Sequence, residues 1–223
     1  MNDAPSWVRI EPFEWGELED TPIGIRYARF RAMVYVMEQN FRDPDVLDLR
    51  GGETDRYDPF SHHFLAFAED STNLIGCART IHNPLGLLPA ERYFPEAIHA
   101  AELDVRRCAE VSRFISRGPS MRSRRSVSLL LIRSLLLTAM QDDLDQVLFI
   151  VEESFTKWLG ALSIPFVRLA DFRQIPEEAG ELAPIVVDVA ECDRELTRRH
   201  PVYAEAVSQG TTRLEMALST IET

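Results

Sequence analysis

The chain has 223 residues, 45% of them hydrophobic, which is enough for a substantial core. Its formal net charge of -12 argues against general nucleic-acid binding, because that binding depends on neutralising phosphates. Its three cysteines form no CxxC pair, and no stretch resembles a secretion signal or a bilayer span, so we expect a cytoplasmic protein without integral membrane association.

The first part of the chain predicts a helix that enters a long loop. Thr21 and Pro22 form a cap and first-turn signal. Apolar residues then recur at spacings of four and three, which predicts an amphipathic helix: Ile23, Tyr27, Phe30, Val34 and Met37. The Pro-, Asp- and Gly-rich stretch that follows predicts a long ordered loop at 41–60, with a functional role.

The rest of the chain alternates predicted strands and helices. Strands are expected at 63–68, 74–81, 109–115, 146–151, 166–170 and 185–189, and helices at 126–140, 152–162, 191–199 and 201–221. This order predicts a single α/β domain over 1–223, with a mixed central sheet, helices on both faces and a C-terminal helical extension at about 191–223.

Charged residues concentrate in three places. Arg31, Tyr35 and Glu38 share one face of the first helix, Glu53, Asp55 and Asp58 lie within six positions, and Glu110 and Arg113 lie on one predicted strand. Carboxylates this dense need cations when they are buried, and Arg31, Arg79 and Arg113 are the natural partners. A calcium loop is the competing interpretation, but the acid and glycine spacing does not fit one, so no metal site is expected.

A cationic patch precedes the long apolar helix. In ISRGPSMRSRRS, four arginines surround one glycine and no acidic residue is present: Arg117, Gly118, Arg122, Arg124 and Arg125. A solvated basic turn is the simpler interpretation of this patch, and a binding site for an acidic partner or a phosphate is the functional one.

In combination, these motifs resemble the acyl-homoserine-lactone (autoinducer) synthase superfamily. The matching residues are Arg31, Tyr35 and Phe41, the acids Asp55 and Asp58, Arg79 with Phe94 downstream, and the pair Glu110 and Arg113. The resemblance implies a GNAT-like acyltransferase fold and transfer of a fatty acyl group from acyl carrier protein or acyl-CoA to a small amine. It implies no tightly bound cofactor.

Departures from the family pattern bear on the acceptor. Tyr35 and Phe41 stand where the superfamily usually has phenylalanine and tryptophan. The surrounding sequence is more similar to PEP-CTERM/exosortase-associated acyltransferases and N-acyl amino acid synthases. An amino acid is therefore preferred to S-adenosylmethionine as acceptor, and both remain open. Tyr35 and Phe41 could line the acceptor pocket or be ordinary core.

Amine attack on a thioester requires a proton acceptor, and Glu110 is the candidate, directly or through a water. With Arg113 it forms the predicted catalytic pair, whereas Arg31, Asp55, Asp58 and Arg79 are expected to order the loop or bind the acceptor. The alternative is that Glu110 only pairs with Arg113 or Arg79, because strand residues three apart share a face only across a bulge.

The basic segment lies where GNAT-like proteins bind the pantetheine pyrophosphate. Because only Gly118 remains of the usual glycine-rich signature, the resemblance favours a phosphopantetheine arm on acyl carrier protein over free coenzyme A. Two rival interpretations are a non-catalytic acyl-binding or regulatory module on the same fold, and nucleic-acid binding through the arginines, which lacks nearby stacking aromatics.

Overall fold

The computed structural model describes residues 7–39, 42–68, 72–82, 87–176, 178, 180–202 and 213–215. The strands are β1 (Trp7–Glu14), β2 (Ser61–Ala68), β3 (Leu74–Ile81), β4 (Cys108–Ser116), β5 (Gln146–Val151), β6 (Val167–Arg168), β7 (Arg173–Gln174), β8 (Glu181–Asp188) and β9 (Arg213–Glu215). The α-helices are α1 (Trp15–Leu18), α2 (Pro22–Ala32), α3 (Pro89–Tyr93), α4 (Pro95–Ala100), α5 (Met121–Gln141), α6 (Glu153–Ala161) and α7 (Val189–Arg199). The π-helix η1 (Met33–Glu38) continues α2, and short 3-10 turns lie at Pro44–Val46, Asp58–Phe60 and Val105–Arg107.

The strands form one mixed sheet in the order β6-β8-β5-β4-β3-β2-β1-β9, and β7 pairs with β8. Neighbouring strands are antiparallel except β4 and β5, which run parallel and are joined through α5. A parallel pair requires such a crossover, because its strands begin at the same end of the sheet. The predicted mixed α/β sheet is confirmed.

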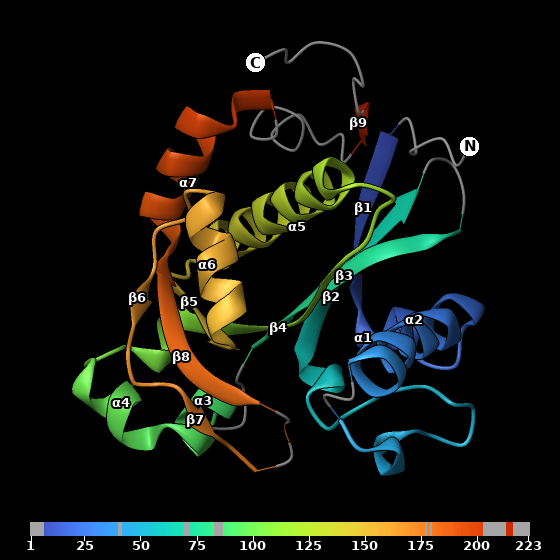
Figure 1. Ribbon diagram of the computed structural model, residues 1–223, viewed down its shortest axis with the longest axis horizontal. Coiled ribbons are helices and arrows are strands. Elements are labelled where there is room, and N and C mark those ends of the chain that lie inside the picture. Colours follow the sequence, from blue (N-terminus) through green and yellow to red (C-terminus); the bar gives the residue numbers. More distant parts are fainter. Residues whose placement is uncertain are drawn as a thin grey trace.

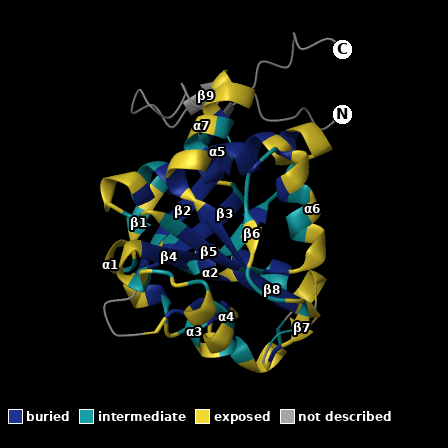
Figure 2. Ribbon diagram, turned by 90° about the vertical axis from the view of Figure 1, so that its left-hand side faces the viewer, coloured by how far each residue is buried: buried dark blue, intermediate teal, exposed yellow. Residues whose placement is uncertain are grey.

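Helices cover both faces of the sheet, as predicted (Figure 1). On one face α5, α6 and α7 pack onto Phe64, Val111 and Ile185 in the larger core cluster. On the other face α2 packs onto Leu65 and Phe67, while α3 and α4 cover the end of the sheet near β5 and β8. Figure 2 shows the resulting gradient, with buried strands inside and the outward sides of the helices exposed.

The strands β4 and β5 separate part-way along their length. They pair over four positions, from Cys108 with Gln146 to Val111 with Phe149, and β4 then continues to Ser116 without a parallel partner. The register between β3 and β4 also shifts beside Arg113, whose φ of 53° lies in the left-handed region. This β-bulge inserts an extra residue into β4 and bends it away from β5.

Several element boundaries differ from the predictions. The long apolar helix starts at Met121 and not at 126, because Ser120 caps it by accepting a hydrogen bond from the Ser123 amide. The predicted helix at 201–221 is wrong at Arg213–Glu215, which pairs with the edge of β1, and residues 203–212 and 216–221 lie outside the described ones. None of the helices among the described residues has the length and apolarity to cross a membrane.

Candidate functional site

A central cavity of about 1140 Å³ opens where β4 and β5 diverge. From β4 it is lined by Glu110, Ser112, Arg113 and Phe114, and from β5 by Phe149, Ile150 and Val151. Arg79 reaches it from β3, and residues from both helical layers also line it, among them Tyr35 and Pro89 from one and Arg122, Phe155 and Trp158 from the other. The cavity therefore passes through the sheet, so two substrates could approach each other from opposite faces.

Glu110 lies at the junction of the paired and the separated parts of β4. It is opposite Ile81 on one side and Leu148 on the other, and its side chain is buried, with the residue 2% exposed. One carboxylate oxygen accepts a 2.7 Å hydrogen bond from the Ala90 amide at the start of α3. Among the ion pairs of the described residues, none involves Glu110, so the alternative of an ion pair with Arg79 or Arg113 gains no support.

The environment of Glu110 changes its acidity. Burial raises the pKa of Glu110 to about 8, and the Ala90 amide and the Arg79 charge oppose this rise only in part. A carboxyl group with this pKa is partly ionised near neutral pH and accepts a proton far more readily than an exposed glutamate. Such a match between pKa and working pH is typical of general bases.

Six charged side chains next to Glu110 form a charge network, composed of Arg31, Glu53, Asp55, Asp58, Arg79 and Arg113. Arg31 pairs with Glu53 and, at 2.6 Å, with Asp58. Arg79 pairs with Asp55 and Asp58 at 2.6 Å each, and Arg113 pairs with Glu53 at 2.6 Å and Asp55 at 2.9 Å. Each guanidinium thus bridges two carboxylates, and three positive charges balance three negative ones.

The network carboxylates remain ionised despite their burial. Burial disfavours the charged forms, but the neighbouring arginines outweigh it and hold the pKa values of Glu53, Asp55 and Asp58 well below their ordinary range. His63 lies directly beneath the network, where burial lowers its pKa to about 4. Its ring accepts a hydrogen bond from Tyr27 and donates one to the Asp58 carbonyl, so it is neutral and structural.

The network fixes the described part of the loop, residues 42–60, against the sheet. The Glu53 amide donates to the Ala28 carbonyl at 3.0 Å, and Leu47 forms a bridge with Glu53. A side chain at Gly52 would approach the Ala28 Cβ at 2.7 Å, so only glycine fits there. The loop carboxylates thus pair with Arg31, Arg79 and Arg113, the three arginines named as their natural partners from the sequence.

The bulge at Arg113 decides which face its side chain occupies. Regular alternation would place residues three apart on opposite faces, but the extra residue and the left-handed φ bring Arg113 to Glu53 and Asp55 on the side of Arg79 and Glu110. The predicted pair Glu110 and Arg113 thus lines one cavity. The two side chains differ in character, because Arg113 is fully engaged by the network.

Tyr35 lies on the π-helical turn η1, where the Gln39 amide bonds to the Val34 carbonyl. It lines the central cavity, and the Arg113 guanidinium lies 5.3 Å from the centre of its ring. The widened turn also explains one wrong prediction, since Met37 is 66% exposed and does not continue the apolar stripe. Phe41, the other predicted aromatic, lies outside the described residues.

The predicted basic loop is helical from Met121 onward and forms the first turn of α5. Arg122, Arg124 and Arg125 are exposed there and line the central cavity. Arg117 and Gly118 instead line an adjoining pocket of about 520 Å³, in which Arg117 pairs with Glu38. The N-terminus of α5 and three exposed arginines together form a suitable site for a phosphate group.

The sequence did not single out Arg42, Phe114 or Phe149 as cavity residues, and it left Phe155 and Trp158 open between core and the lining of an acyl tunnel. Arg42, from the loop, lines the cavity and pairs with Glu178, while its Nε is buried without a hydrogen-bond partner. Phe114, Phe149, Phe155 and Trp158 form an aromatic cluster with ring centroids 5.1 to 6.0 Å apart. The sequence predicted a helix with apolar residues at 152–162, but the spacing of these residues does not show which of them line a cavity and which belong to the core.

The side chains Cys108, Ser61 and His63 do not line the cavity and are engaged by other partners. Burial raises the pKa of the Cys108 thiol to about 11, and its sulfur contacts the Gln146 side chain. Ser61 donates to the Tyr57 carbonyl, and His63 beside it is occupied by Tyr27 and Asp58. None of these three residues is therefore placed to form a covalent acyl-enzyme in the cavity.

Known structures share this architecture. The CoA-dependent acyl-homoserine lactone synthase MesI is similar with a TM-score of 0.65 at 20% identity, over 91% of this chain and 95% of that one. The acyl-homoserine lactone synthase LasI gives 0.66 at 19% identity, over 87% and 94%. FeeM, an N-acyl amino acid synthase from uncultured soil microbes, gives 0.60 at 16% identity, over 87% and 98%. Among curated proteins, none matches the chain.

The fold is that of GNAT-like acyltransferases, and the chain shares it with acyl-homoserine lactone synthases of known structure. Residues 25–178, more than half of the chain, match the model of the family of N-acyl amino acid synthase FeeM. The chain belongs to this family and is an N-acyltransferase, which moves an acyl group from a thioester donor to an amine.

Proposed function

We propose that this N-acyltransferase transfers a fatty acyl group from acyl carrier protein to the amino group of an amino acid, with Glu110 as the general base. The observation that carries the proposal is the position of Glu110, which is buried, free of ion pairs and placed where the cavity passes between β4 and β5. The free thiols of Cys77, Cys108 and Cys192 suit a reducing cytoplasm as the site of the reaction.

The chemistry follows from the protonation of the acceptor. An amino acid carries an ammonium group, and its nitrogen attacks a thioester only after losing a proton. Ionised Glu110 takes this proton, directly or through a water, and the neutral amine adds to the thioester carbonyl. The tetrahedral intermediate then expels the carrier thiolate, and the proton returns to the sulfur as the amide product forms.

The separated part of β4 offers groups that stabilise the oxyanion. Beyond Val111 the backbone of β4 has lost its partner strand β5, so its edge is directed at the central cavity. Backbone amides held rigidly at such an edge donate hydrogen bonds to a carbonyl oxygen that gains negative charge. The same edge would position the extended pantetheine arm.

The acceptor carboxylate requires a cation on the Glu110 side of the cavity. Arg79 and Arg113 each pair with two carboxylates of the charge network. Arg42 pairs with Glu178 and, at 3.7 Å, with Glu53, but its buried Nε has no hydrogen-bond partner. Arg42 lies on the loop that the network holds in place, close to Tyr35 in the cavity lining. We assign the acceptor carboxylate to Arg42, and the ordering of its loop to the network.

The carrier is assigned to the first turn of α5. Arg122, Arg124 and Arg125 lie at the mouth of the cavity, and no ion pair of the described residues involves them. This exposed positive surface is complementary to an acidic carrier protein and to the phosphate of its arm. The aromatic cluster around Phe155 and Trp158 provides the apolar surface for the acyl chain.

Product analysis by mass spectrometry tests the assignment. Purified chain is supplied with acyl carrier protein or coenzyme A thioesters and with either a mixture of amino acids or S-adenosylmethionine. We expect N-acyl amino acids, made faster from the carrier-protein donor. Acyl-homoserine lactone as the product would overturn the acceptor assignment, and equal rates with both donors would overturn the carrier assignment.

A charge reversal isolates the carrier surface. Replacing Arg124→Glu and Arg125→Glu together should raise the KM for acyl carrier protein much more than the KM for acyl-CoA, because only the protein donor contacts an extended surface. Arg106→Glu is the matched control, since Arg106 is exposed but does not line the cavity.

A further inference from the structure

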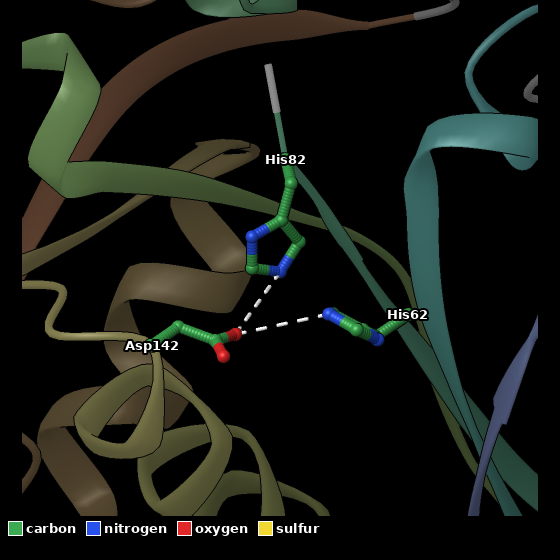
Figure 3. Close-up of side chains that lie close together, drawn as sticks. All are labelled: His62, His82 and Asp142. Atoms are coloured by element: carbon green, nitrogen blue, oxygen red, sulfur yellow. Dashed lines mark ion pairs between the residues drawn. The ribbon is translucent and has the colours of Figure 1, made fainter. Parts of the chain in front are cut away.

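A second cluster of titratable side chains lies away from the central cavity. His62 on β2, His82 just after β3 and Asp142 at the C-terminal cap of α5 converge on one point (Figure 3). One ligand atom from each lies within 4.8 Å of the others, and among the described residues no other group of three histidine, cysteine or acidic side chains does so. None of the three residues lines the cavity.

The carboxylate of Glu14 fixes the orientation of the His62 ring. Glu14 lies opposite His62 in the register of β1 and β2, and its carboxylate contacts the His62 Nδ1. A hydrogen atom on Nδ1 makes this contact, so the Nε2 of the neutral ring carries a lone pair. That Nε2 is directed at the Asp142 Oδ2, 3.7 Å away.

His82 reaches the same oxygen atom. Its Nε2 lies 3.8 Å from the Asp142 Oδ2, and it is buried without a hydrogen-bond partner. Both separations exceed hydrogen-bonding range. They are close to the spacing between ligands that share one ion, because bonds of about 2.0–2.1 Å at tetrahedral angles separate ligand atoms by roughly 3.3–3.5 Å.

We propose that His62, His82 and Asp142 bind a divalent transition-metal ion of the zinc class, with a fourth position left for solvent. Two imidazoles favour zinc, nickel or copper over calcium and magnesium, which prefer oxygen ligands. Glu14 takes the role of the carboxylate that orients a metal-bound histidine. The partial exposure of all three side chains gives the ion a path from solvent.

The location indicates a structural role for this metal. α5 carries the arginines at its N-terminus and Asp142 at its C-terminus, so an ion here would tie the far end of that helix to the ends of β2 and β3. The ligands of the proposed site come from three distant segments, which no local spacing could reveal.

Metal titration of the tag-free, chelator-treated chain tests the proposal. Calorimetry with Zn²⁺ should show one saturable site, and Co²⁺ should give the visible absorption of a low-coordinate complex. At 100 times the Kd, Zn²⁺ should raise the Tm by roughly 5–10 °C. Absence of saturable binding to the intact chain would overturn the proposal.

Variants assign the ligands. His82→Ala and Asp142→Asn should abolish binding, whereas Glu14→Gln should weaken it by about 10- to 100-fold, as loss of an orienting carboxylate does. His99→Ala is the control, because His99 is an exposed histidine of α4 outside the cluster. Asp142 is exposed, so its variant is expected to fold, and unchanged Zn²⁺ affinity in Asp142→Asn would contradict the assignment. Acyl transfer is not needed for any of these measurements.

Discussion

Neighbouring acids at this site have opposite properties because their partners differ. Asp58 and Glu110 are both almost completely buried. Asp58 accepts hydrogen bonds from two guanidinium groups and stays ionised, whereas Glu110 faces one backbone amide and holds its proton more tightly. The three arginines neutralise the loop carboxylates and leave Glu110 as the group whose protonation can change near neutral pH.

This contrast predicts the pH dependence of acyl transfer. The proposed mechanism needs ionised Glu110, so kcat/KM should rise with pH and level off above the pKa of about 8. Glu110→Gln should lower turnover by about 100- to 10,000-fold and remove that inflection, because the amide cannot accept the proton.

The measurement is kcat/KM as a function of pH for the unsubstituted chain and for Glu110→Gln. Glu96→Gln is the control, because Glu96 is an exposed residue of α4. An inflection that persists in the Glu110→Gln variant would assign the titration to the acceptor amine and remove Glu110 from the mechanism.

Asp58→Asn tests the structural role of the network. The substitution removes the charge that Arg31 and Arg79 share and leaves both guanidiniums buried with fewer partners. We expect the free energy of unfolding to fall by about 3–5 kcal/mol, as when one partner of a buried ion pair is removed. Urea unfolding measures it, with exposed Asp45→Asn as the control, and a loss below about 1 kcal/mol, the range of exposed pairs, would contradict the buried network.

Among the secondary-structure elements, sequence patterns located the regular ones well. The strands at 74–81 and 146–151 were predicted with their observed bounds, and α2 was placed from its cap and spacing. The start of α5 was missed, because its first turn is basic and lacks the apolar period that marks the rest of the helix. β1 was also missed, since Pro12 interrupts its pattern.

The irregular features depend on contacts that a single sequence does not display. The left-handed φ of Arg113 falls on a residue type that rarely adopts it, so only its pairing with Glu53 and Asp55 explains the bulge. The π-turn at Tyr35 likewise follows from packing against β4. The sequence could predict which charges meet, but not that Glu110 would stay outside their network.

Gly118→Ala tests the approach to the first turn of α5. A Cβ at this position would lie 2.5 Å from the Ser123 Cβ and 3.1 Å from the Arg124 amide nitrogen, so the turn must shift. Strain of about 1–3 kcal/mol, typical of overpacking, would raise the KM for the donor by roughly 10- to 100-fold if it falls on the bound state. Steady-state kinetics with Gly160→Ala as a control, where a Cβ meets no atom within 4 Å, provide the measurement. An unchanged KM would remove this turn from donor binding.

For the whole molecule, the charge network links stability to acid. The folded pKa values of Glu53, Asp55 and Asp58 lie below their ordinary values of 4.5 and 3.8, so the native state binds fewer protons than the unfolded state at low pH. The stabilisation is present above about pH 4 and is lost as the pH falls below it. Glu110, with its pKa raised to about 8, and His63, with its pKa lowered to about 4, also change the total unfolding free energy below neutral pH, so the network is isolated by comparison with Asp58→Asn. The difference in unfolding free energy between the two chains should shrink as the pH falls below about 4, and a constant difference would contradict the linkage.

The divided sheet has a consequence for how members of this family could differ. β4 and β5 are held together by four residue pairs, and the cavity occupies the gap beyond them, along a seam between two blocks of strands. Exchanging Phe114 or Trp158 would reshape that seam without breaking any strand pairing or any bond of the six-member network. Under the proposed function, the acyl chain that fits would therefore change while the strand order and the network stay the same. Both side chains also pack against the larger core cluster, so stability would change with them.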